Sequence, residues 1–178
     1  MPADLQLLER RSQQGDASAF GALLRLWDDD LRGVAWSVVR SGPATDDVMQ
    51  DAYERAFRSI GGFDGRSSMK TWLHSIVYRT AIDHYRYEGR RQHDDVETLR
   101  DVHETNAQHR PERAAIDRAE LASVLDTCPE DQRAMLMLTA GLGYSFDETA
   151  EILDMQRGTV ASRVGRLRKR LGRWEDEG

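Results

Sequence analysis

A set of hydroxyl and guanidinium side chains recurs at helical spacing near the C-terminus. It comprises Thr159, Ser162, Arg163, Arg166 and Arg170. On an exposed helix, such groups can hydrogen-bond to base edges and to phosphates in the major groove of DNA. Arginines in the last turns of a helix also occur only because cations complement the helix dipole and keep a surface soluble. The side chains alone therefore leave the choice between DNA binding and a solvated helix open.

The residues before this set predict the helices that would position it. Ser145 and Glu148 have the spacing of a capping box, which starts one helix, and a turn at residues 154–158 leads to a second helix. The second helix has one apolar stripe, made of Val160, Val164, Leu167 and Leu171. Burying that stripe turns the hydroxyls and arginines outward. Two amphipathic helices around a tight turn form a helix-turn-helix, which favours DNA reading by the second helix.

A second charged stripe lies on a long helix predicted for residues 68–87. It contains Arg79, Asp83, Arg86 and Arg90, with Tyr78, Tyr85 and Tyr87 among them. Aromatic rings interleaved with cations can bind single-stranded nucleic acid, because bases stack on the rings and cations follow the backbone. The tyrosines equally fit the rim of a core, with the arginines paired to Asp83. The sequence leaves these two interpretations balanced.

An acidic face is predicted on a helix that begins at Thr45 and ends near residue 60. Its outer side carries Asp47, Gln50, Asp51 and Glu54 as well as Arg55 and Arg58. This face fits either an ordinary solvated surface or a docking site for a basic partner helix. A turn-rich loop follows at residues 61–68, and its one aromatic residue, Phe63, is expected to be exposed.

The composition restricts the function further. The chain has 178 residues and a formal net charge of −6, so it is not expected to coat DNA unaided, because phosphate neutralisation dominates non-specific affinity. Its single cysteine, Cys128, allows no internal disulfide. The sequence contains no nucleophile with a base at readable spacing, no glycine-rich phosphate loop and no metal-ligand cluster. We therefore expect no catalytic residues, no cofactor and no metal site.

Membrane insertion by the chain itself is not expected either. No run of about 18 apolar residues occurs, and the N-terminus lacks the apolar core of a signal peptide. These features predict a cytoplasmic location.

The predicted fold class is all-α, with two small helical domains. Helices are predicted for residues 16–40, 45–60, 68–87, 112–127 and 130–140, followed by the helix-turn-helix. Residues 89–111 are polar and lack periodicity, which is typical of a flexible linker. The predicted division is a first domain at residues 1–88, a linker at 89–111 and a second domain at 112–178.

The whole pattern resembles the small extracytoplasmic-function group of bacterial RNA polymerase sigma factors. The first domain is similar to sigma domain two in GDASAFGALLRLW, DDVMQDAYERAF and SSMKTWLHSIVYRTAIDHYR. The second is similar to sigma domain four in LDTCPEDQRAMLMLTAGLGYSFDETAEILDMQRGTVASRVGRLRKRL. Several stretches in matching order are far more specific than a helix-turn-helix alone.

The resemblance implies a role for each surface. It assigns polymerase docking to Asp47, Gln50, Asp51 and Glu54. It assigns recognition and opening of the minus-ten promoter element to Phe63, Lys70, Trp72, Arg79, Asp83 and Arg86. It assigns the minus-thirty-five element to Thr159, Ser162, Arg163 and Arg166, with Arg168 and Arg170 on phosphates. The partners it implies are core RNA polymerase, promoter DNA and an anti-sigma factor.

One residue departs from the family pattern, and two other functions fit parts of the sequence. Many members have asparagine where this chain has Arg79, and a long cation cannot reproduce the paired donor and acceptor of an amide, so the minus-ten base preference is open. A stand-alone helix-turn-helix regulator would bind promoter DNA tightly without polymerase. A sigma-like decoy would bind an anti-sigma factor without reading DNA, but it would have no use for the arginines of residues 163–170.

Overall fold

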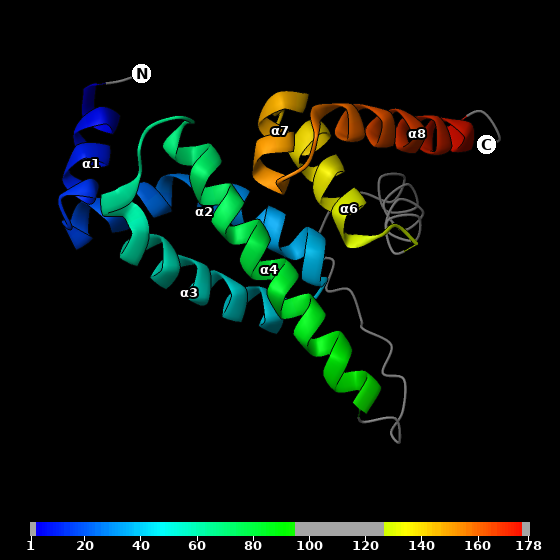
Figure 1. Ribbon diagram of the computed structural model, residues 1–178, viewed down its shortest axis with the longest axis horizontal. Helices are drawn as coiled ribbons and strands as arrows, with labels where there is room; N and C mark the ends of the chain where they lie inside the picture. The colour runs from blue at the N-terminus through cyan, green and yellow to red at the C-terminus, as the bar shows by residue number, and fades with distance from the viewer. Residues whose placement is uncertain (1–2, 95–126, 176–178) are drawn as a thin grey trace, which may run out of the picture.

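The structure is a computed structural model that describes residues 3–94 and 127–175. Every regular element in these ranges is helical, which confirms the all-α fold class. The elements are α1 (Ala3–Gln13), α2 (Ala17–Val39), α3 (Gly42–Ser59), the 3-10 helix η1 (Ile60–Gly62), α4 (Met69–Asp94), α6 (Glu130–Leu136), the π-helix η2 (Met137–Gly141), α7 (Phe146–Leu153) and α8 (Arg157–Glu175). Figure 1 shows α1–α4 as an N-terminal unit and α6–α8 as a C-terminal unit.

Helix α2 is the long central helix of the N-terminal unit, and it matches the prediction for residues 16–40. The Asp16 carboxylate caps it by accepting hydrogen bonds from the backbone N–H groups of Ser18 and Ala19, at 2.9 and 3.0 Å. Arg40 ends it in the left-handed conformation, with φ of 55°. Helix α1 was not predicted, and its Leu5 and Leu8 are partly buried against the core.

Two helix boundaries differ from the prediction. Helix α3 begins at Gly42 rather than Thr45, because Ser41 caps it and Pro43 is tolerated in the first turn of a helix. Helix α4 continues to Asp94, past the predicted end at residue 87 and into the predicted linker. Residues 95–111 of that linker, and most of the helix predicted for residues 112–127, lie outside the described residues.

The C-terminal unit contains the predicted helix-turn-helix. Ser145 and Glu148 form the full capping box: the Glu148 N–H donates to Ser145 Oγ at 3.2 Å, and the Ser145 N–H donates to Glu148 Oε2 at 2.9 Å. Asp154, with φ of 53°, ends α7 in the left-handed conformation and turns the chain toward α8. Val160, Val164 and Leu167 of the predicted apolar stripe are buried, and the side chain of its fourth member, Leu171, lies outside the described residues.

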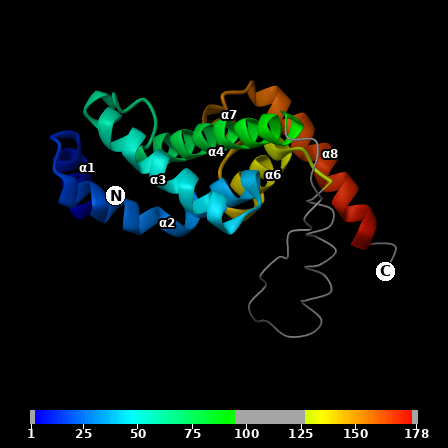
Figure 2. The ribbon, with the colours of Figure 1, turned by 90° about the horizontal axis from the view of Figure 1, so that it is seen from below.

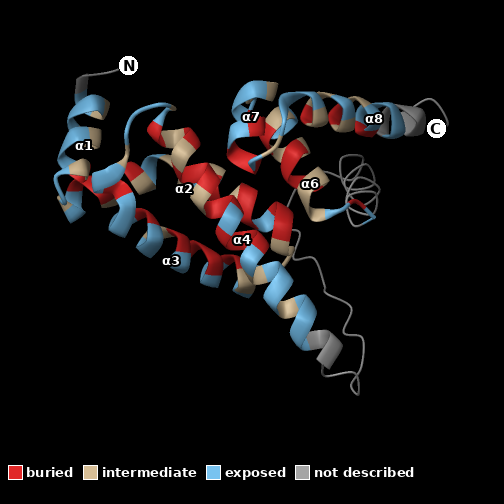
Figure 3. Cartoon of the chain, in the orientation of Figure 1, coloured by how far each residue is buried: buried red, intermediate tan, exposed pale blue. Residues whose placement is uncertain are grey.

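The two units share one hydrophobic core. Helix α6 packs against α2, and α7 packs along α4 (Figure 2). We call this contact the interunit seam. Buried residues run through both units where they meet (Figure 3). On one side of the seam, Met137 of η2 lies so close to Gly33 of α2 that a Cβ atom at that glycine would overlap Met137 Cε.

Arg133 of α6 is a buried cation within the seam. Its side chain is buried, and its guanidinium donates to the carbonyl oxygens of Ser37, Val38 and Cys128 at 2.7, 2.9 and 2.5 Å. Ser37 and Val38 belong to the last turn of α2, whose carbonyls have no partner within their own helix. A residue of the C-terminal unit therefore completes the hydrogen bonding of a helix in the N-terminal unit.

His74 of α4 lies on the other side of the seam and is fully buried. Its Nδ1 is 2.8 Å from the carbonyl oxygen of Lys70 and 3.2 Å from the hydroxyl of Tyr144, and its ring meets the Tyr144 ring edge-on. Burial lowers the pKa of His74; the Lys70 carbonyl and the nearby Asp30 carboxylate raise it, and the Lys70 ammonium lowers it. The net pKa is below the ordinary value of 6.5, so the neutral imidazole is the form that the fold stabilises.

Because the fold stabilises the neutral imidazole of His74, we expect the protein to lose stability in mild acid. The unfolded chain takes up a proton on His74 near pH 6.5 while the folded chain does not. The free energy of unfolding is therefore expected to fall as the pH drops below 6.5 toward the folded pKa, by at most about 1.4 kcal/mol per pH unit. Urea denaturation of the wild type and of His74→Gln between pH 7.5 and 5 measures this difference. If the free energy of unfolding changes equally with pH in the two proteins, His74 is not the group whose protonation causes the loss of stability.

Candidate nucleic-acid interface

Helix α8 presents the hydroxyl and guanidinium set on its outer surface. Ser162, Arg166, Arg168 and Arg170 are exposed, whereas Thr159 and Arg163 are half-buried. The Ser162 hydroxyl donates to the carbonyl oxygen of Thr159 at 3.0 Å. Within the described residues, no ion pair engages Arg166 or Arg168. Lys169 is likewise exposed and has no ion pair in the described ranges, so all three cations can meet an external anion.

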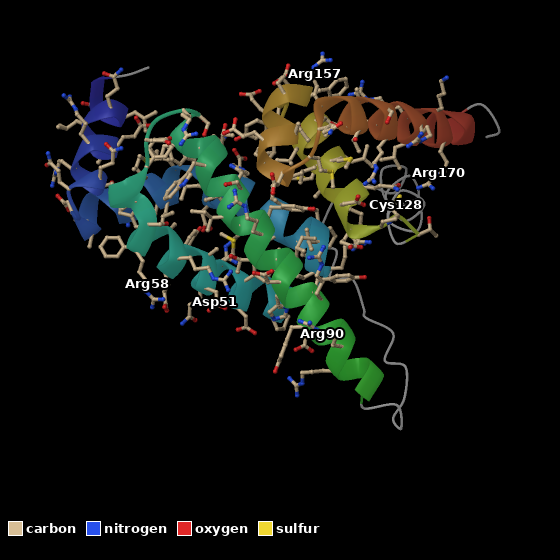
Figure 4. All side chains as sticks on the ribbon, in the orientation of Figure 1. Asp51, Arg58, Arg90, Cys128, Arg157 and Arg170 are labelled. Atoms are coloured by element: carbon tan, nitrogen blue, oxygen red, sulfur yellow. The ribbon has the colours of Figure 1, made fainter. Side chains whose placement is uncertain are left out.

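Two other arginines of α8 already have contacts inside the C-terminal unit. Arg163 forms an ion pair with Asp131 of α6. Arg170 donates to Cys128 Sγ at 2.6 Å (Figure 4). These contacts tie α8 to the start of α6. Arg163 is consequently held in a fixed orientation, although a guanidinium has five N–H donors and one carboxylate uses only part of them.

The charged stripe of α4 includes exposed cations and a carboxylate that contacts a neighbouring helix. Arg79 and Arg86 are exposed, and Arg79 Nη2 donates to Ser75 Oγ at 3.3 Å. The Asp83 carboxylate accepts from Arg55 Nη1 of α3 at 3.2 Å, so Asp83 links α4 to α3 instead of bridging the arginines of its own helix. Tyr78 is buried at 7% exposure, whereas Tyr85 and Tyr87 are exposed. Tyr78 thus fits the core interpretation, and nucleic-acid binding by Tyr85 and Tyr87 stays a prediction.

The loop before α4 forms one wall of a cavity of about 390 Å³. Phe63 was expected to be exposed, but its ring packs on Trp72 with centroids 5.3 Å apart and is half-buried. The Asp64 carboxylate accepts hydrogen bonds from the backbone N–H and the Nε of Arg66, and these bonds lower the pKa of Asp64. Side chains of α4 form the opposite wall, among them Trp72, Ser75 and Arg79. The cavity thus combines two aromatic rings with two arginines, two carboxylates and two hydroxyls.

Lys70 lies at the edge of the seam. Its ammonium is 2.6 Å from an Asp30 carboxylate oxygen of α2 and 5.9 Å from the centre of the Tyr144 ring. Lys70 and Asp30 side chains are both about one-third exposed. The family resemblance assigned Lys70 to the minus-ten element, but this ion pair makes its ammonium less available for an external phosphate.

The acidic face of α3 points away from the C-terminal unit. Asp47, Gln50, Asp51 and Glu54 are all exposed, and Figure 4 places Asp51 on the outer side of the helix. Only Glu54 has an ion pair within the described residues, with Arg58 at 2.9 Å. The face is thus a continuous acidic and amide surface.

Of the three aspartates at residues 28–30, Asp28 and Asp30 make internal contacts, Asp30 with Lys70, whereas Asp29 is exposed. Asp28 accepts hydrogen bonds from Arg32 and from the hydroxyl of Tyr53, and Arg32 also pairs with Asp46. Burial and the Asp28 contact both raise the pKa of Tyr53. No cluster of histidine, cysteine, aspartate or glutamate that could hold a metal occurs in the two described ranges. None of the described helices is long and apolar enough to cross a membrane.

The sequence did not predict the apolar cavity that lies at the seam. It has a volume of about 660 Å³ and lies between α2 and the α6–η2 segment, with Trp36, Leu136 and Met137 in its lining. Its walls come from segments about 100 residues apart in the chain, counting from Trp36 to Leu136. No local pattern in the sequence signals such a site, because neither wall is unusual on its own.

Comparison with known families matches both units of the chain. The family model described as Sigma-70 region 2 matches residues 23–91, and the model described as Sigma-70, region 4 matches residues 118–171. The first match includes α3 and the loop before α4, and the second includes α6, α7 and most of α8.

Curated relatives match over most of their length. The chain is 33% identical to RNA polymerase sigma-H factor of Pseudomonas aeruginosa, over 94% of this chain and 91% of the relative. It is 31% identical to ECF RNA polymerase sigma-E factor of Escherichia coli, over 93% and 91%. It is also 33% identical to ECF RNA polymerase sigma factor SigM of Mycobacterium tuberculosis, over 89% and 78%.

Two solved structures share the fold. CnrH, solved in complex with the cytosolic domain of CnrY, aligns with a TM-score of 0.70 and 25% identity over 98% of each chain. The sigma factor RpoE of Bartonella quintana, solved with the anti-sigma factor NepR, aligns with a TM-score of 0.70 and 27% identity over 85% of this chain and 93% of that chain. The chain belongs to the extracytoplasmic-function group of RNA polymerase sigma factors.

Proposed function

We propose that this chain docks on core RNA polymerase through the outer face of α3 and directs initiation at promoters that it reads at two elements. The observation that carries the proposal is the presence of two separate exposed cationic surfaces, on α4 and α8, in a chain with a net charge of −6. Each surface is too small for tight DNA binding alone, and joining two weak sites raises the effective concentration of the second. Polymerase supplies the catalysis, and the chain itself acts as a non-enzymatic initiation factor.

The docking surface consists of the acidic and amide face of α3. Asp47, Gln50, Asp51 and Glu54 are exposed on one helix without burial by either unit. Carboxylates in such an arrangement attract a basic helix of a partner and steer its encounter.

The cavity beside Phe63 is proposed to receive a base extruded from the minus-ten element. Its two aromatic rings offer stacking surfaces, and Arg79 with Ser75 offers hydrogen-bond donors at the opposite wall. Arg86 is exposed further along α4, where it can contact the phosphate backbone of DNA. Asp83 is proposed to hold this helix against α3, because its carboxylate is engaged by Arg55.

Helix α8 is proposed to read the minus-thirty-five element in the major groove. Arg166 is exposed on the outer side, one turn beyond Ser162, and suits a base edge. Arg168 and Arg170 lie nearer the end of the helix and suit phosphates. Arg163 is held by Asp131, so it would reach a base in one fixed orientation.

An anti-sigma factor is the proposed negative regulator. RpoE of Bartonella quintana was solved with the anti-sigma factor NepR, and CnrH with the cytosolic domain of CnrY. Binding of such a factor to this chain is therefore the expected mode of control.

Run-off transcription with core polymerase on a promoter library tests the proposal. The chain is expected to direct specific initiation from a subset of promoters and to bind promoter DNA weakly without polymerase. Binding to polymerase without specific initiation would support a decoy instead. Tight promoter binding by the chain alone would support a stand-alone regulator.

Charge reversal on α3 is expected to weaken polymerase binding. Asp51→Lys places a cation in the acidic face, and the expected loss is about tenfold in affinity for core polymerase, or about 1.4 kcal/mol. Asp29→Lys makes the same charge change at an exposed position of α2 and is expected to bind normally. Fluorescence anisotropy with labelled chain measures both. Equal affinities for the two variants would remove α3 from the docking surface.

Substitutions on α8 are expected to separate base reading from phosphate binding. Arg166→Ala should cost about 1 to 3 kcal/mol at particular upstream bases and little at others. Arg168→Ala should weaken holoenzyme binding similarly for all sequences. Competition between promoter variants for the holoenzyme measures both patterns. A uniform loss for Arg166→Ala would show that this residue contacts only phosphates.

A further inference from the structure

Phe63 lines two cavities, so packing alone does not fix its position. One is the cavity of about 390 Å³ that is proposed to receive a minus-ten base. The other has a volume of about 290 Å³ and lies beside helix α1, with Glu9, Gln13 and Met69 in its lining. A side chain in a close-packed interior is held by its neighbours on every side, but Phe63 has open space toward α1 and toward α4. Its position therefore depends on a few directional contacts.

Three contacts hold Phe63. Its ring packs on Trp72 with the ring centroids 5.3 Å apart, and its backbone N–H donates to the carbonyl oxygen of Ile60 at 3.1 Å. Its own carbonyl oxygen accepts a hydrogen bond from Nε2 of Gln13 at 3.2 Å. Of the three, the Gln13 contact is the one that comes from α1, 50 residues earlier in the chain.

The end of α1 that carries Gln13 is itself well anchored. The chain turns at Gly15, with φ of 86°, and the Arg11 guanidinium donates to the Asp16 carboxylate at 2.9 and 2.6 Å. The same carboxylate caps α2, so it joins the end of α1 to the central helix. Helix α1 also lies beside η1 (Figure 1), where a Cβ atom at Gly61 would be 3.6 Å from the Gln13 carbonyl oxygen. The Gln13 amide therefore extends from a fixed support.

The position of Phe63 matters for the choice of base. A base stacked on the Phe63 ring would meet the donors of Ser75 and Arg79, which line the same cavity. Hydrogen bonds weaken steeply when donor and acceptor are misaligned, and base edges differ in where their donors and acceptors lie. A shift of the ring relative to Arg79 would therefore change which base edge fits.

We propose that Gln13 is a positioning residue for the base-binding cavity: by holding the Phe63 carbonyl oxygen, it sets the position of the Phe63 ring and thereby the preference for a minus-ten base. The inference rests on the proposed function for the role of the cavity, but the contact between α1 and the loop does not. Gln13 acts through Phe63 and not by touching DNA. Helix α1 thus contributes to promoter choice, although the family resemblance assigned none of its residues to DNA.

Amide hydrogen exchange tests whether Gln13 holds the loop. Gln13→Met keeps a side chain of similar length and removes the donor. Gln6→Met makes the same change in the lining of the same cavity, and the Gln6 side chain has no hydrogen bond in the part of the chain that the structure describes. Peptides from residues 61–68 are expected to exchange about fivefold faster in Gln13→Met than in Gln6→Met. Equal exchange would contradict the proposal, and this measurement needs neither polymerase nor DNA.

Base selectivity tests whether this contact sets the minus-ten preference. Holoenzymes formed with each variant are offered promoter fragments that differ at single minus-ten bases, and the ratio of affinities for the preferred and the other bases is measured. Gln13→Met is expected to lower this ratio about fivefold at one minus-ten position and to leave selectivity at the minus-thirty-five element unchanged. Gln6→Met is expected to keep both. Unchanged minus-ten selectivity in Gln13→Met would overturn the inference.

A rescue variant separates the hydrogen bond from packing. Gln13→Lys returns an N–H donor on a long side chain and is expected to restore most of the lost ratio. Its added charge acts on phosphates and so affects all base sequences alike. A ratio that stays low in Gln13→Lys would assign the effect to packing and contradict the proposal. If the wild-type holoenzyme shows no selectivity at any minus-ten base, the proposed function fails, and the exchange rates still decide whether Gln13 holds the loop.

Discussion

A buried guanidinium has to find hydrogen-bond acceptors, and Arg133 finds them at the end of a helix in the other unit. The last turn of any α-helix leaves carbonyl oxygens without partners, so α2 offers a fixed site for a cation. Docking α6 at that site brings α7 along α4 and places Tyr144 against His74. Arg133 and the carbonyl groups of Ser37 and Val38, together with the shared hydrophobic core, therefore set the relative positions of both candidate DNA-reading helices.

Many charged side chains of this protein form ion pairs with a neighbouring side chain, and this pairing affects the surface potential as much as the net charge does. Several cations that could meet DNA are held by nearby carboxylates, Lys70 by Asp30 and Arg163 by Asp131. Such pairs at a surface contribute little to stability, so their effect is mainly to orient the side chains and to lower the positive potential around them. We therefore expect a weak intrinsic affinity for DNA, which suits a protein that relies on a larger partner to reach its promoters.

The sequence predicted local structure well and contacts between the units not at all. The capping box of Ser145 and Glu148 is a short-range pattern, and the structure confirms it. The end of α4 was predicted too early because the residues after Gly89 lack an apolar stripe, yet a solvated helix needs none when its residues have good helix propensity. Arg133 could not be recognised, since its acceptors are backbone atoms about 95 residues away. The site residues were placed by family resemblance, and their roles stay predictions.

The link between Arg55 and Asp83 has a consequence for genetics. Arg55 belongs to the helix proposed to dock on polymerase, but its guanidinium contacts Thr80 and Asp83 on the helix proposed to read the promoter. Mutant alleles at this position are expected to show altered promoter choice as well as altered polymerase binding. A screen that sorts alleles by phenotype alone would then assign Arg55 to both the polymerase surface and the promoter surface. Second-site suppressors at Asp83 would instead show that Arg55 acts through its contact between α3 and α4.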